Sequence, residues 1–591
     1  MPKSIDHPHR SRTGSWESHT PCPDGSAHPT GKPTRRGPAD GRHLLDRILN
    51  TPRLEQVVPR LPPDLLHRVI KSCGLEDCSE LVALATSEQL ARIFDLDLWR
   101  AGRPGMDEQF DADRFGVWIE VLVESGAEVA ARKLAGTDAD IVAAGLARQV
   151  LVYDRAAVMP YETLDGEQME VSHAGGDGLT FDVGGYLLVA KRTDSWDAII
   201  EVLLALSERH RDYFHQVMGR CRLLSNAGRE VDGLDDLLAA EDQAMFDLAV
   251  DREGRREKQG YVAPAEAREF LQMARDLRLG PDAVPPVSSS ANPIVGAYLR
   301  AQNDRMNEGM NERLGANADS DSMPLVAESQ TLPAAEDIAE GVATVFDVLL
   351  EAGVLDQSPR GLLSAPDGHA TRLGRIQVLM QSVLEQNQTA YSARNDELVY
   401  LANTLMAGCS IQARPFTARE ASDAAAAVCN LGLENWPPHW LPANTTSLPS
   451  SFLVDHDLIS VFQVGWAVLH KDVSMYAAEH LIEVLTRIRC DDREIQTWLD
   501  GLRIQMAKHC RARAPWRARD ALDVIAILDT TAWAVLLDLI DEFPVLHTAA
   551  GASKDPRTVF VSASDFEFIS ENGQIASVRE FMQSLPQRLC S

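Results

Sequence analysis

The sequence lacks the motifs that identify most enzymes. It contains no G-x-x-x-x-G-K-[ST] phosphate loop, no H-E-x-x-H metal-binding helix, no G-x-S-x-G nucleophile turn, no dinucleotide-binding G-x-G-x-x-G after a strand and no EF-hand loop. None of its nine cysteines forms a C-x-x-C pair, and such pairs are typical of zinc fingers and redox centres. We therefore predict no metal site and no cofactor.

Long apolar runs are also missing. Segment 1–42 has no apolar stretch of the kind that a secretory signal needs. The most apolar stretches, 461–469 and 530–537, are far shorter than the roughly 18–20 residues that cross a bilayer. An odd number of scattered cysteines favours reduced thiols. The sequence therefore predicts a cytoplasmic protein without membrane insertion.

Basic residues are fewer than acidic residues. Lys and Arg number 57 against 87 Asp and Glu, which gives a formal net charge of −30. Such a field repels phosphate backbones, so nucleic acid is not expected as the main partner. Hydrophobic types make up 45% of the 591 residues, which is ample for sizeable cores.

Helical signals dominate what is present. A proline-led helix is predicted from 61–63, with Leu66 and Ile70 on its apolar face. Segment 86–94 repeats this layout, with Thr86 and Gln89 as a capping box. A glycine-rich stretch, 159–192, is typical of a short β-hairpin, and Asp194 is expected to cap the amphipathic helix that follows.

These patterns predict a mainly α, multi-domain protein with stacked helix pairs at the N-terminus and a small β-hairpin. The proline-rich, polar stretch 281–333 is interpreted as a linker. A short strand is expected at 558–561, followed by a last helix. We expect a disordered tail (1–42), a helical repeat-like region (43–158), a hairpin plus helical region (159–280), the linker (281–333) and a C-terminal helical domain (334–591).

Three blocks carry a resemblance to a known family. The first combines Leu61-Pro62-Pro63, 74–77, 80–85 and 94–99; the second runs from Arg252 to Ala267; the third is Phe568-Ile569. Together they resemble an uncharacterised bacterial domain-of-unknown-function family of long, helical cytosolic proteins. The resemblance covers roughly half of the chain and implies no particular activity.

The helix pairs are also similar, at the level of fold, to the cytosolic superhelical domain of the magnesium transporter family and to the middle domain of flagellar motor switch proteins. No magnesium ligand of that domain is placed on this sequence, so this likeness implies no site residue.

Titratable residues suggest one candidate catalytic group. His456, His470 and His480 follow one another in a segment that also contains carboxylates, and a histidine oriented by a carboxylate is the core of much acid–base chemistry. No serine or cysteine nucleophile is identifiable beside them. Helix capping and surface pairing are the alternative interpretation.

Arg255 and Arg256 are the candidate binding residues. They belong to a charged stretch that Gly260 is expected to close, and Pro264 is expected to begin the next helix. Such a corner holds guanidinium groups in fixed positions, where they either form internal ion pairs or bind an acidic partner. A plain exposed helix is the alternative.

Without a catalytic motif, the sequence favours a non-catalytic cytosolic interaction or scaffold protein with a protein partner. The alternative is a metal-dependent or acid–base enzyme whose site is assembled from scattered His, Asp and Glu residues of the C-terminal domain.

Overall fold

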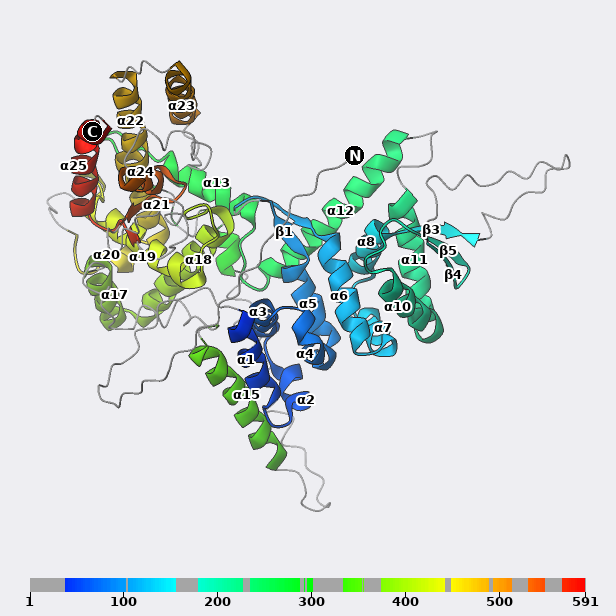
Figure 1. Cartoon of the computed structure of the whole chain (residues 1–591). Coiled ribbons are helices and arrows are strands. Elements are labelled where there is room, and N and C mark those ends of the chain that lie inside the picture. Colours follow the sequence, from blue (N-terminus) through cyan, green and yellow to red (C-terminus); the bar gives the residue numbers. More distant parts are fainter. Residues whose placement is uncertain are drawn as a thin grey trace, which may run out of the picture.

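The computed structural model describes residues 38–102, 105–155, 179–226, 234–286, 288, 292, 295–300, 333–352, 354, 374–441, 448–487, 493–512, 530–547 and 566–589. It is mainly helical with small antiparallel sheets, as predicted (Figure 1). Among these residues, no helix is both long and apolar enough to span a membrane.

The amino-terminal half begins at Pro38, inside the segment predicted as a tail. Its elements are α1 (Pro38–Leu49), α2 (Leu54–Val57), η1 (Val58–Arg60), α3 (Pro63–Cys73), η2 (Glu76–Cys78), α4 (Ser79–Leu84), α5 (Ser87–Asp97), β1 (Trp99–Ala101), β2 (Glu108–Phe110), α6 (Ala112–Glu124), α7 (Ala127–Ala135), α8 (Ala139–Gln149), β3 (Val150–Asp154), β4 (Thr180–Val183), β5 (Tyr186–Ala190), α10 (Trp196–Arg209), α11 (Arg211–Asn226) and α12 (Leu234–Glu257).

Helices α3 and α5 form where the sequence predicts them. Proline occupies the first turn of α3, where a missing N–H costs no hydrogen bond. Thr86 and Gln89 form the predicted capping box of α5. The Gln89 side chain also donates to the carbonyls of Val58 (2.8 Å) and Leu61 (2.7 Å). This buried amide ties α5 to the turn before α3, on which α5 packs.

The predicted hairpin is present as β4 and β5. Gly184 and Gly185 both have positive φ and make the two-residue turn between Val183 and Tyr186, a geometry that other residues rarely adopt. Strand β3 adds to β5, which gives a three-stranded antiparallel sheet in the order β3-β5-β4. The Asp194 cap was a wrong prediction: Ser195 is the N-cap of α10, and no side chain caps it.

The carboxy-terminal half contains α13 (Pro264–Arg275), α15 (Pro333–Glu351), α17 (Gly374–Gln386), α18 (Gln388–Gly408), α19 (Ala418–Glu434), η4 (Pro438–Trp440), α20 (Phe452–Asp455), α21 (Leu458–Leu469), η5 (His470–Met475, a π-helix), α22 (Tyr476–Arg487), α23 (Arg493–Ala512), α24 (Thr530–Ile540), β6 (Val545–His547), β7 (Phe566–Phe568) and α25 (Asn572–Leu589). The predicted strand at 558–561 lies outside the described residues.

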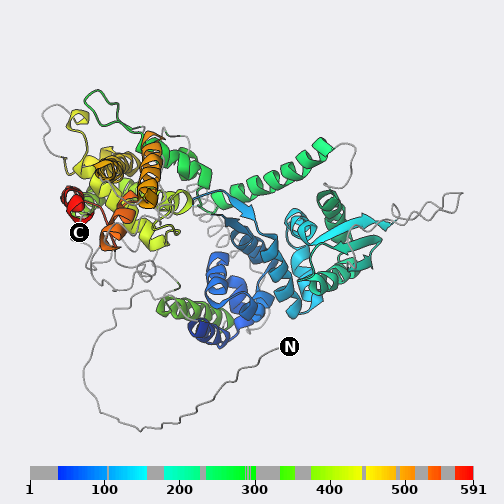
Figure 2. The same ribbon diagram turned by 45° about the horizontal axis from the view of Figure 1, so that its top comes forward.

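Two hydrophobic cores form, and they do not follow the order of the chain. Helix α13, together with buried Val295 and Tyr298, joins the carboxy-terminal core. Helix α15 returns to the amino-terminal core, where it packs on α1 and α2. Figures 1 and 2 show the green α15 beside the dark blue α1. The division of the chain near 281–333 stays a prediction about independent folding.

The two cores meet around α13. Arg268 of α13 donates to the carbonyl of Gly105 (2.6 Å) and pairs with Asp107 (2.7 Å). Gly105 also lies against the backbone of Gly408, at the end of α18. The corner between α12 and α13 has the predicted geometry, because Gly260 has a φ of 93° and Pro264 begins α13. Loop β1–β2 is thus held against the carboxy-terminal half.

Candidate functional site: a cationic pocket

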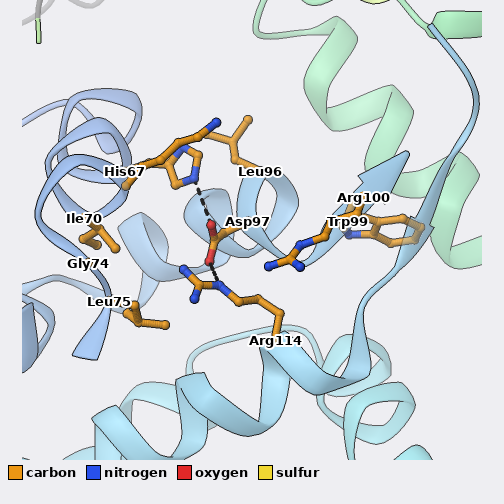
Figure 3. Close-up of a pocket in the computed structure, with 10 residues that line it drawn as sticks. His67, Ile70, Gly74, Leu75, Leu96, Asp97, Trp99, Arg100 and Arg114 are labelled. Atoms are coloured by element: carbon orange, nitrogen blue, oxygen red, sulfur yellow. Dashed lines mark hydrogen bonds and ion pairs between the residues drawn. The ribbon is translucent and has the colours of Figure 1, made fainter. Parts of the chain in front are cut away.

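A pocket of about 350 Å³ opens between α3, α5, β1 and α6 (Figure 3). Its lining consists of His67, Ile70, Lys71, Gly74, Leu75, Leu96, Asp97, Trp99, Arg100 and Arg114. Apolar residues of α3 and of the turn after it form one wall. Three of the remaining residues, Lys71, Arg100 and Arg114, are cationic, in a chain with a formal net charge of −30.

Asp97 organises the pocket from the last residue of α5. One carboxylate oxygen lies 3.2 Å from His67 Nε2. The other accepts hydrogen bonds from Arg114 Nε (2.6 Å) and Trp118 Nε1 (2.8 Å). Burial alone would raise the pKa of Asp97, but these hydrogen bonds and the charge of Arg114 hold it well below its ordinary value. Asp97 is therefore a carboxylate that fixes its neighbours.

The cationic groups keep hydrogen-bond donors open toward the pocket. Arg114 uses Nε for Asp97, and Arg100 uses Nε for Asp111 at 2.9 Å. No described residue pairs with their terminal Nη atoms or with the exposed ammonium of Lys71. Figure 3 shows both guanidinium groups extending toward Asp97. Arginines held in this way are preorganised for an oxyanion.

A second cationic cluster lies behind the pocket, at the end of α12. Arg255 forms a bidentate ion pair with Asp95 (2.7 and 2.9 Å), whose side chain is only 3% exposed. Arg256 pairs with Glu108 (2.7 Å), which Arg252 also contacts. Arg255 and Arg256 are thus held in internal ion pairs, which is a structural role. The predicted binding role of these two arginines stays a prediction.

Arg252 connects this cluster to the pocket wall. Its guanidinium lies 4.6 Å from the ring centroid of Trp99, a cation–π distance, and its Nε donates to the carbonyl of Asp95 (2.6 Å). Burial and the charge of Arg256 lower the pKa of Arg252 to about 10. Helix α5 thus contacts the end of α12 through Asp95, and Asp97, the last residue of α5, organises the pocket.

Replacing Arg255 with alanine is expected to destabilise the protein by about 1–3 kcal/mol, because the buried carboxylate of Asp95 loses its bidentate partner. This loss is smaller than the roughly 3–5 kcal/mol of a fully buried pair, since 37% of the Arg255 side chain is exposed. Arg256→Ala should cost less, because Glu108 keeps Arg252. Urea denaturation measures both losses, and the reverse order would contradict this assignment.

The three candidate catalytic histidines contact different neighbours. His456 stacks on Phe452, with ring centroids 4.3 Å apart. His470 is buried beside Trp466, and burial together with the charge of Arg275 holds its pKa well below the ordinary value. His480 lies 4.0 Å from Glu483. No group of three or more His, Cys, Asp or Glu within the described ranges could hold a metal ion. Their catalytic role stays a prediction.

A buried carboxylate cluster lies in the carboxy-terminal core, and the sequence analysis did not single it out. Glu542 accepts from the backbone N–H and hydroxyl of Ser410. Asp538 accepts from Gln412 (3.2 Å) and lies 2.9 Å from His547 Nδ1. Gln412 has a φ of 49°, an uncommon conformation for a residue other than glycine. The next residue, Ala413, shares this conformation, so the loop is strained where it meets the carboxylates.

Residues 36–230 match the model of a family of unknown function, DUF6178. No curated protein and no solved structure matches the chain. The DUF6178 match contains every residue that lines the pocket. It also contains the first block of the predicted resemblance, 61–99. The blocks at 252–267 and 568–569 lie beyond it, so their part in that resemblance stays a prediction.

The pocket could not be predicted from the sequence, because its lining residues come from four separate elements and the turn after α3. Asp97 lay within the first block of the resemblance, and a carboxylate among Phe94, Leu96 and Leu98 was the only local signal. Arg100 lies in β1, beyond the end of α5, and β1, β2 and the turn around Gly105 separate Arg114 from Asp97 in the sequence. Only the packing of α6 against the end of α5 brings Arg114 to Asp97.

Proposed function

We propose that this chain is a non-catalytic, cytoplasmic interaction protein that binds an acidic group of a partner protein in the cationic pocket. One observation carries the proposal: the terminal Nη atoms of Arg100 and Arg114 and the ammonium of Lys71 have no partner among the described residues. Guanidinium groups that are anchored through Nε and keep their Nη donors open are suited to an external anion.

The surroundings support a binding role. Because Asp97 and Asp111 anchor the two guanidinium groups, little side-chain freedom is lost when a ligand arrives. The apolar residues Ile70 and Leu75 give the pocket a hydrophobic wall, which suits a side chain and its flanking peptide. The six described cysteines are thiols, which agrees with a reducing compartment.

We expect the double variant Lys71→Glu, Arg100→Glu to capture the partner at least about tenfold more weakly. The acidic group of the partner would then face two glutamates of like charge in place of two cations. Capture from the source cell's extract on immobilised full-length chain, followed by quantification of retained proteins, measures the effect. The matched control is Lys471→Glu with Arg487→Glu, which changes the net charge equally on exposed positions of the carboxy-terminal half.

The outcome that contradicts the proposal is equal retention by both charge-reversed proteins. Thermal melting of each variant must accompany the capture, because Arg100 pairs with Asp111 and its loss could loosen β1. A variant that melts like the parent and loses the partner supports a binding site.

The alternative of a metal-dependent or acid–base enzyme is supported by one observation: His470 is buried, and its Nε2 has no hydrogen-bond partner within the part of the chain that the structure describes. Metal analysis of the purified protein separates the two hypotheses. Stoichiometric zinc, iron or manganese that is lost in His470→Ala would favour the enzyme over the interaction protein.

A further inference from the structure

We propose that the anion recognised by the pocket is a phosphate monoester on a side chain of the partner protein. This inference rests on the proposed function, because it assumes that the pocket is the docking site. It adds the chemical class of the ligand, and the number, type and placement of the open donors carry it.

Trp99 has a buried indole N–H at the pocket. It lines the pocket, is only 5% exposed, and its Nε1 has no hydrogen-bond partner among the described residues. A buried N–H without an acceptor is costly, so native structures nearly always satisfy such groups. In Figure 3 the indole nitrogen lies on the side of the ring toward Arg100. An oxyanion in the pocket would supply the missing acceptor.

The pocket presents more donors than a carboxylate can use. A carboxylate presents two oxygens in one plane, and a single guanidinium can satisfy both. Here the Nη atoms of two guanidinium groups, the ammonium of Lys71 and the indole N–H of Trp99 line one pocket. A phosphate monoester has three terminal oxygens arranged tetrahedrally, so it uses donors that arrive from several directions.

The charge of the lining also favours a phosphate. Lys71, Arg100 and Arg114 bring three positive charges, and Asp97 and Asp111 remove two of them. The lining therefore keeps a net positive charge. A phosphate monoester carries about −1.5 to −2 at neutral pH, so this charge attracts it more strongly than a single carboxylate of charge −1. The formal net charge of −30 opposes anionic membranes and nucleic acids, so a phosphorylated protein is the favoured source.

The test is isothermal titration calorimetry of the full-length chain with inorganic phosphate and with acetate as probes. We expect phosphate to bind at least tenfold more tightly than acetate, and its affinity to fall with added salt. Arg100→Ala should weaken phosphate binding at least tenfold. Trp99→Phe, which keeps an aromatic ring against Arg252, should weaken it several-fold. The matched control Arg487→Ala, at a residue with a side chain 77% exposed, should bind like the parent.

Peptides and vesicles identify the source of the phosphate. A phosphoserine peptide should bind more tightly than the same peptide with aspartate or serine at that position. Tighter binding to vesicles that contain a phosphoinositide would overturn the assignment to a protein partner.

The failures of the two proposals are distinguishable. The phosphate assignment is contradicted if phosphate and acetate bind with equal affinity. If partner capture is still lost in the Lys71→Glu, Arg100→Glu protein, that result leaves the proposed function supported. Phosphate binding that Arg100→Ala does not change also overturns the inference, because the anion then binds elsewhere. If neither charge-reversed protein loses capture of the partner, the proposed function itself is contradicted.

Discussion

Alanine at Gly465 is expected to destabilise the carboxy-terminal core by about 4 kcal/mol or more, which places it among the most damaging single substitutions. Gly465 of α21 and Gly432 of α19 face each other where these two helices cross. A Cβ at Gly465 would lie 1.9 Å from the carbonyl oxygen of Val428, and one at Gly432 would lie 2.0 Å from that of Val461.

The loss is large because the obstruction is backbone. A flexible side chain can rotate away from an added methyl group, but a helix carbonyl moves only when the whole helix shifts. Helix α21 is the centre of this core, and every residue from Leu458 to Leu469 is buried. Separating α19 from α21 would therefore open contacts along both helices.

Gly501→Ala is the matched control for this prediction. Gly501 is also helical, in α23, but a Cβ there meets nothing within 4 Å. Alanine should stabilise this helix by about 0.5–1 kcal/mol, because glycine loses more backbone entropy on folding. Urea denaturation, or the soluble yield if a variant does not fold, compares the two. A Gly465→Ala protein within about 1 kcal/mol of the parent would refute the close crossing.

Asp541→Asn is expected to remove a pH dependence of stability centred between about pH 4 and pH 7. Burial raises the pKa of Asp541 from its ordinary 3.8 to about 7, and the charges of Glu542 and Asp538 act in the same direction. Hydrogen bonds from the backbone N–H groups of Glu542 and Gln412 oppose the shift without cancelling it.

The sign follows from proton binding. Between about pH 4 and pH 7 the folded protein holds a proton on Asp541 that the unfolded chain has released. The stabilisation from protonated Asp541 is therefore full below about pH 4 and is lost as the pH rises through 7. A shift from 3.8 to about 7 corresponds to on the order of 4 kcal/mol. The amide that replaces this carboxyl in the Asp541→Asn protein carries no charge at pH 8, so the variant should be more stable than the parent there by up to that amount.

Urea denaturation of both proteins from pH 4 to pH 8 measures this difference. His470 acts in the opposite direction, because its lowered pKa makes the unfolded chain bind the proton first on acidification. The difference between parent and variant isolates Asp541, since His470, Arg275, Cys409, Asp538, Glu542 and His547 are common to both. Asp455→Asn, at an exposed position of the same half, is the control. Parallel pH profiles for parent and Asp541→Asn would refute the prediction.

Local structure followed from local sequence where one interaction type dominated. The capping box of Thr86 and Gln89 and the positive φ of Gly260 were predicted because a few neighbouring residues determine a helix end. The prediction that Asp194 caps the next helix was wrong, because the helix starts at Trp196 and Ser195 takes the N-cap position. A shift of one residue changes which side chain can reach the first free N–H groups.

By itself, the sequence determined the mainly helical class, the hairpin and the acidic character of the chain, because periodicity, turn residues and net charge are properties of short segments or of simple sums. Tertiary structure alone decided which helices share a core, which arginines are paired and which keep open donors. The return of α15 to α1, the meeting of Arg114 with Asp97 and the crossing at Gly432 and Gly465 all join residues that are distant in the chain. Contacts of that kind depend on how whole faces pack, and no spacing within one segment records them.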